Sequence, residues 1–136
     1  MGMYTEFNAA LCFKKNTPSS VIEIIECLLG DKEWPEKLPE HDFFKSSRFR
    51  MVLTCDSYYF PSISDSKMEQ DRIDHRYHLN IRCNLKNYDD EIEKFLDFIS
   101  THIETEGFLG YMRHEEFENP TLIYCEDGKS RFRYVG

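Results

Sequence analysis

The clearest pattern in the chain is an alternation of apolar and polar side chains over residues 76–86. A period of two is typical of a β-strand with one face in the core and the other turned away from it. The apolar positions are Tyr77, Leu79, Ile81, Cys83 and Leu85. The polar positions are Arg76, His78, Asn80, Arg82, Asn84 and Lys86, a set without an acid. Such a set predicts a face that recognises anions, carboxylates or planar polar groups.

The same period predicts further strands at residues 5–13 and 48–58, and extends the strand above back to about residue 72. In residues 48–58 the side chains expected to face the core are Phe49, Met51, Leu53 and Cys55. Those expected to face outward are Arg48, Arg50, Val52, Thr54 and Asp56. Shorter runs predict strands at 108–115, 120–126 and 131–135. The Asp127-Gly128 pair between the last two predicts a type I′ hairpin turn.

Two segments have the three-to-four-residue spacing of amphipathic helices. The first follows Thr17, its expected N-cap, and ends at Gly30. The second follows the candidate caps Asn87 and Asp89 and has apolar residues from Ile92 onward. Residues 31–47 are rich in aromatic side chains and are expected to pack across an end of the sheet. Residues 60–71 are polar and are expected to form a loop.

The expected order is therefore βαββαβ followed by a hairpin. This order resembles the split-βαβ, ferredoxin-like topology, an antiparallel sheet with two helices on one face and the other face open. The fold class predicted is α+β, and the chain of 136 residues fits a single domain over residues 1–136.

Charge and cysteine content narrow the class of protein. The net charge is −8, and residues 89–118 carry all of it, with ten acids against two bases. No broad basic excess remains, which disfavours nucleic acid as a partner. No apolar run reaches the ~18 residues of a membrane span. Five cysteines without a C-x-x-C pair predict reduced thiols in a cytoplasmic protein and no zinc site.

The outward residues of the strands are the candidate ligand- or partner-binding residues: Arg48, Arg50, His78, Asn80, Arg82, Asn84, Tyr111 and Arg113. Three interpretations stay open. The face is solvated and its arginines pair with acids such as Glu6 and Asp56; it is an interface with a partner or a second copy; or it holds a small anion, nucleotide-like or carboxylate, around Arg50, His78 and Arg82.

Catalysis is not favoured by the motifs. His75 and His78 form H-x-x-H, but on a strand they point to opposite sides and cannot share a metal. No set of nucleophile, base and orienting group accompanies His78. We therefore predict no catalytic residue, no cofactor and no metal, and an enzyme is less expected than a binding protein.

Acidic side chains form a second candidate surface: Glu104, Glu106, Glu115, Glu116 and Glu118. They are either an ordinary solvated face or a surface that docks a basic partner, as an acidic inhibitor or immunity-type protein does. The function predicted first is a non-enzymatic protein-interaction module that uses the polar sheet face, with a homodimer as one form of it. The small-anion protein and the acidic inhibitor are the alternatives.

Overall fold

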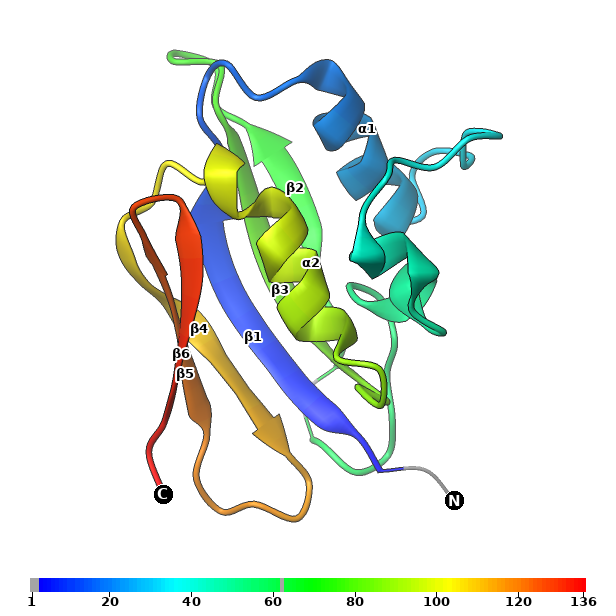
Figure 1. Ribbon diagram of the computed structural model, residues 1–136, viewed down its shortest axis with the longest axis vertical. Helices are drawn as coiled ribbons and strands as arrows, with labels where there is room; N and C mark the ends of the chain where they lie inside the picture. The colour runs from blue at the N-terminus through cyan, green and yellow to red at the C-terminus, as the bar shows by residue number, and fades with distance from the viewer. Residues whose placement is uncertain (1–2, 62) are drawn as a thin grey trace.

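The computed structural model of the protein describes residues 3–61 and 63–136 and shows one antiparallel sheet with two helices (Figure 1). The six strands lie in the order β2-β3-β1-β4-β5-β6. Their bounds are β1 Thr5–Cys12, β2 Lys67–Gln70, β3 Tyr77–Leu85, β4 Gly107–His114, β5 Thr121–Glu126 and β6 Lys129–Tyr134. The α+β class predicted from the periodicities is confirmed.

The core lies between the sheet and the helices α1 (Ser19–Leu28) and α2 (Glu91–Ile99), which Figure 1 shows on the same side of β1 and β3. The apolar positions of the alternating segments fill it, as predicted. Those from the two central strands are Phe7, Ala9, Leu11, Leu79, Ile81, Cys83 and Leu85, and α2 adds Ile92, Phe95, Leu96 and Ile99. Both helices are short, so burial of these stripes rather than helix propensity stabilises them.

The helix ends follow the sequence in part. Gly30 has φ +85°, the left-handed conformation expected after the last turn of α1. The N-cap position of α2 is Asp90, so the predicted caps Asn87 and Asp89 do not occupy it. Asn87 Oδ1 nevertheless accepts a hydrogen bond from Ile92 N in the first turn, at 2.8 Å. The prediction for Thr17 is wrong. Its hydroxyl donates to Lys14 O at 2.7 Å, and Pro18 occupies the cap position of α1.

The predicted strand over residues 48–58 is wrong. Phe49–Met51 form a single 3-10 turn, and the predicted burial is reversed at two positions, because Val52 is fully buried and Met51 is 48% exposed; Leu53 is buried as predicted. The Phe49 ring packs 5.5 Å from Trp34 and 5.8 Å from Phe43, centroid to centroid. This aromatic contact holds Phe49–Met51 on the helix side of the molecule, away from the sheet in which a strand would pair.

The second strand lies instead at Lys67–Gln70, inside the segment predicted as a loop, and pairs with β3 from Lys67–Asn80 to Gln70–Tyr77. Residues 71–76 form the turn that follows, so β3 starts later than residue 72. The aromatic connection 31–47 packs along α2, with the Phe43 and Phe95 ring centroids 5.5 Å apart.

The C-terminal hairpin is confirmed. Asp127 and Gly128 have φ values of +52° and +74°, the pair of left-handed residues that a type I′ turn requires. Within residues 3–61 and 63–136, no helix is both long enough and apolar enough to cross a lipid bilayer.

Candidate binding face on the open side of the sheet

The side of the sheet opposite the helices carries most of the residues predicted for binding. On the two central strands Asn8 pairs with Arg82 and Ala10 with Asn80, and β4 places Tyr111 opposite Asn8. Asn8 Nδ2 donates to the Tyr111 hydroxyl at 3.2 Å. The structure thus brings Asn80, Arg82 and Tyr111 onto one surface, with His78 toward one end of β3 and Asn84 and Arg113 toward the other.

Residues 55–60 cover one end of this surface. Cys55 O accepts from Asn84 N at 3.1 Å, and Asp56 Oδ1 accepts from Asn84 Nδ2 at 3.3 Å. The Phe60 ring is 5% exposed and lies under the guanidinium of Arg113, 5.4 Å from its centroid. Asn84, fully buried, therefore holds the covering segment in place.

Arg113 already has a partner within the protein. Its Nη2 lies 3.4 Å from Oε1 of Glu6, which is 6% exposed and sits opposite it on β1. The guanidinium thus compensates a buried carboxylate, which is expensive to leave without a partner. Asn84 and Arg113, the two predicted binding residues at this end, are therefore less exposed than Asn80 and Arg82.

The rest of the surface is open, and we call it the open half-face: Asn8, Ala10, Asn80, Arg82, Phe108 and Tyr111. These residues surround a shallow hollow of about 580 Å³. Its floor is low because Ala10 is small and Gly110 has no side chain. A Cβ on Gly110 would lie 2.0 Å from Asn8 O, so the close approach of β4 to β1 requires glycine there.

Sequence reasoning missed Ala10 and Phe108 as parts of this surface, and Tyr124 beside it. Phe108 is 55% exposed and forms a T-shaped pair with Tyr124 at 5.7 Å, which makes an aromatic wall beside the hollow. The sequence did contain a hint, because Phe108 on β4 and Tyr124 on β5 are aromatic residues at positions that face away from the core. A β-bulge between Phe108 and Gly110 shifts that phase along β4, so simple alternation could not locate it.

The open side carries a small positive excess although the chain is acidic. Outward cations on the strands are Lys67, Arg82, Arg113, Lys129, Arg131 and Arg133; outward acids are Glu6, Glu69 and Glu126. On the strands alone, six cations against three acids give an excess of +3. The connecting segments add Asp65, which lines the hollow, and Asp56, which bonds to Asn84. Six cations against five acids leave an excess of +1, in a chain that carries −8.

Arg48 and Arg50 do not belong to this face, because the strand that would have placed them there does not form. The Arg48 guanidinium lies 5.3 Å from the Tyr88 ring centroid, and its backbone N donates to Glu91 Oε2 at 3.0 Å. Arg50 lies 5.1 Å from the Trp34 ring centroid. Both arginines are therefore on the helix side, away from Asn80 and Arg82.

His78 lies beside two acids and a thiol. Ligand atoms of Asp71, Asp74 and His78 lie within 4.8 Å of one another, and Cys12 Sγ is 3.8 Å from His78 Nε2. A metal could be held by these groups on distance alone, but Asp71 Oδ1 already accepts from the backbone of the turn, and Asp74 pairs with Arg76 at 3.6 Å. Burial raises the pKa of the Cys12 thiol, so it is not an activated nucleophile at neutral pH.

The predicted acidic surface is split in two. Glu104 and Glu106 precede β4, while Glu115, Glu116 and Glu118 follow it, and eight residues of strand separate the groups by about 25 Å. Glu104 pairs with Arg76 at 3.7 Å, and Glu106 accepts a hydrogen bond from Asp127 N at 2.9 Å. The five acids therefore do not form one docking patch.

Comparison with known proteins adds nothing to this geometry: no family model, curated protein or solved structure matches the chain.

Proposed function

We propose that the protein is a non-enzymatic binding module that recognises an acidic segment of a partner protein through the open half-face. The observation that carries the proposal is an uncovered hollow lined by two cations, Arg82 and Lys67, and one acid, Asp65, in a chain of net charge −8. A surface with this contrast attracts an acidic partner and orients it during encounter.

The composition of the half-face supports a protein partner. Arg82, Tyr111 and Phe108 are of residue types enriched at interfaces, and the hollow over Ala10 can receive one apolar side chain. A nucleic acid is less favoured, because the net charge of the chain repels phosphates at long range.

The other functions considered are less well supported. A homodimer through this face would place two basic surfaces against each other. The small-anion site loses Arg50, which lies on the helix side. An acidic inhibitor would need a continuous acidic patch, but the five predicted acids lie at opposite ends of β4.

We also propose that the fold is ferredoxin-like with a C-terminal hairpin. The support is the order β2-β3-β1-β4 for the first four strands, in which α1 follows β1 and α2 follows β3. The proposed location is the cytoplasm, since all five cysteines are free thiols, as is usual in a reducing compartment.

Selection from a display library of random peptides tests the proposed function. The selected peptides should be rich in Asp and Glu and contain an apolar anchor, and their binding should weaken as salt increases. Arg82→Glu and Phe108→Ala should each abolish binding. Lys37→Glu, an equal charge reversal in the exposed loop before η1 (Asp42–Lys45), is the matched control and should bind as wild type.

Three results would contradict the proposal. Selected peptides with no acidic bias would remove the electrostatic argument. A dimer seen by analytical ultracentrifugation and lost in Arg82→Glu would assign the face to self-association. Binding of oligouridylate that both half-face variants abolish would assign it to single-stranded RNA.

A further inference from the structure

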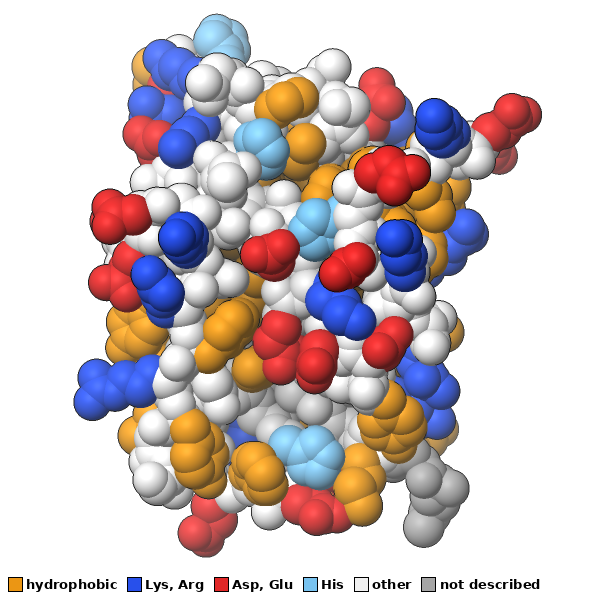
Figure 2. Space-filling view, viewed as in Figure 1, with side chains coloured by type: hydrophobic (Ala, Val, Ile, Leu, Met, Phe, Trp, Pro, Cys, Tyr) orange, Lys and Arg blue, Asp and Glu red, His pale blue; other side chains and the backbone are white. Residues whose placement is uncertain are grey.

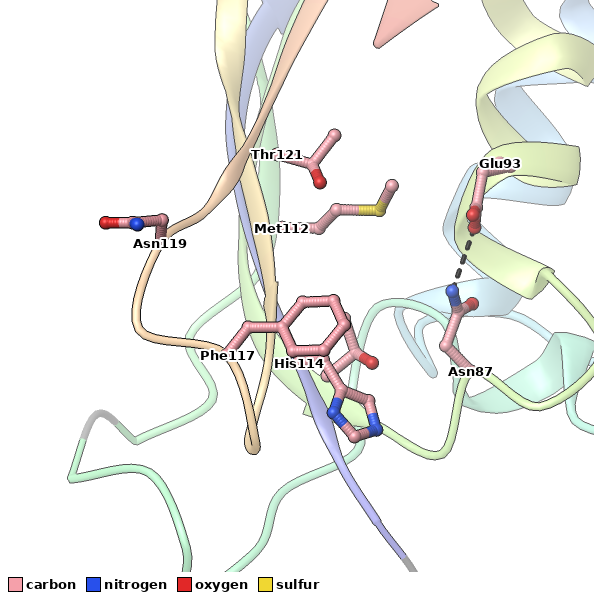
Figure 3. A pocket seen from close by; sticks show the side chains of 8 residues that line it. Asn87, Glu93, Met112, His114, Phe117, Asn119 and Thr121 are labelled. Atoms are coloured by element: carbon pink, nitrogen blue, oxygen red, sulfur yellow. Dashed lines mark hydrogen bonds between the residues drawn. The ribbon is translucent and has the colours of Figure 1, made fainter. Parts of the chain in front are cut away.

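A second hollow lies on the other side of the sheet, where the start of α2 faces the end of β4 and the beginnings of β1 and β5 (Figure 3). Its volume is about 300 Å³, at the small end of ligand sites. It shares no lining residue with the open half-face. Its occupant is therefore a question separate from the proposed function.

One wall is a fixed pair of side chains. Asn87 Oδ1 caps α2 through Ile92 N, and Asn87 Nδ2 donates to Glu93 Oε1 at 2.8 Å. Because the capping bond sets the orientation of the amide, it also sets the position of the Glu93 carboxyl. Figure 3 shows this pair facing Thr121, Met112 and Phe117 across the hollow.

The opposite wall combines apolar surface with polar groups. Met112 and the Phe117 ring supply the apolar part, and Phe117 is held between His114 at 5.4 Å and Tyr134 at 5.8 Å. His114 Nδ1 accepts from Glu116 N at 3.2 Å, so the neutral ring carries its proton on Nε2. The Thr121 hydroxyl adds a group that can donate or accept.

Glu93 determines the charge of the site. Among the lining residues in the described part of the chain, Glu93 is the only acid, and none is Lys or Arg. Burial raises the pKa of Glu93 and the nearby Asp90 and Glu91 carboxylates raise it further, while the Asn87 hydrogen bond opposes them. Figure 2 shows acidic side chains gathered over the helix on this face of the molecule. The site therefore repels an anion, whereas a bound cation would offset the free-energy penalty of burying the Glu93 carboxylate.

We propose that this hollow binds a small organic cation, an ammonium group on a short apolar chain. The ammonium lies on the Glu93 carboxylate and donates to it and to the Thr121 hydroxyl, and the chain lies along Met112 and Phe117. The aromatic ring adds cation–π attraction. The same chemistry is offered by a free alkylamine and by a lysine side chain of another protein.

Titrations followed by ¹H–¹⁵N correlation spectra test the site and separate the two sources. The probes are n-butylamine, Nα-acetyl-lysine amide and, as an anion of matched size, n-butanoate. Butylammonium should shift the amides of Thr5, Glu93, Met112 and His114, with a dissociation constant in the millimolar range, and butanoate should not. Binding of the lysine derivative but not of butylamine assigns the site to a lysine side chain, and the reverse assigns it to a free amine.

Glu93→Gln is the decisive variant. It keeps the shape of the side chain and can still accept from Asn87, so the fold is retained while the charge is lost. Affinity for butylammonium should fall by about tenfold or more, the value of one charge-assisted hydrogen bond. Phe117→Ala, at a 52% exposed position, should weaken binding without affecting folding. Glu69→Gln on β2 is the matched control and should leave the affinity unchanged.

The proposal is overturned by any of three outcomes: no shift with either amine, equal affinity in wild type and Glu93→Gln, or butanoate binding as tightly as butylammonium. None of these outcomes bears on the open half-face, because its variants and probes are different.

Discussion

Val52 and Met51 give the sharpest test of the fold, because sequence alternation and the structure assign them opposite environments. In a strand over residues 48–58 Met51 would be buried and Val52 exposed. In the structure Val52 is fully buried and Met51 is 48% exposed. The Val52 carbonyl also accepts from Cys83 Sγ at 3.1 Å, which fixes the turn against the core strand β3.

The magnitude follows from the buried atoms. Val52→Ala removes two buried methyl groups, each contributing about 0.8 kcal/mol of transfer free energy, and leaves a cavity. We expect the free energy of unfolding to fall by about 2–3 kcal/mol. With an unfolding entropy of about 2.1 cal/mol/K per residue, this corresponds to a melting temperature lower by about 7–10 °C. Met51→Ala should change stability by less than about 0.5 kcal/mol.

Urea unfolding followed by far-UV circular dichroism measures both changes. Leu53→Ala is the positive control, because Leu53 is buried in the structure and would also be buried in the predicted strand. It should cost about 2–5 kcal/mol under either arrangement. A Met51→Ala variant less stable than Val52→Ala would refute the turn and restore the strand.

Three further predictions concern single positions. Gly110→Ala should prevent folding, since its Cβ would lie 2.0 Å from Asn8 O, and a wild-type circular dichroism melt would contradict this close approach. Gly128→Ala should lower the free energy of unfolding by about 1–2 kcal/mol, because φ is +74°, whereas Asp127→Gly should be neutral or stabilising in the same urea assay. Burial raises the pKa of Glu93 above its ordinary 4.5, so the unfolded chain loses this proton first. We therefore compare the free energy of unfolding of wild type with that of Glu93→Gln, and wild type minus variant should fall as pH rises from 4.5 through the pKa of Glu93 in the folded protein. If wild type minus variant rises with pH instead, the fold stabilises the Glu93 carboxylate.

Much of the candidate binding face could be predicted from the sequence. His78, Asn80 and Arg82 were located by the alternation of their own strand, which depends only on neighbours two residues away. Tyr111 followed in the same way from β4. The neighbours that complete the open half-face, Ala10 and Phe108, depend on strand register and on a bulge. Both are set by pairing between distant segments.

The closure of the other half of the face could not be predicted. Asn84 and Arg113 carry the same polar pattern as Asn80 and Arg82, yet residues 55–60 cover them. The hollow beside α2 was likewise invisible, because Glu93 and Asn87 face β4 and β5 only after the helix packs. The hydrophobic periodicity of a segment depends on neighbouring residues only, so it cannot indicate which loop will cover which face of the sheet.

The sequence by itself determined the central strands, both helices and the terminal hairpin, because hydrophobic period and turn residues act over a few neighbours. Only the tertiary structure decided where residues 48–58 lie. The Phe49 ring, packed against Trp34 and Phe43, holds the start of this segment on the helix side, and residues 55–58 then cross to the open side, where Asp56 bonds to Asn84. The contacts made by a buried aromatic ring come from distant parts of the chain, and their free energy exceeds the weak local preference for a strand.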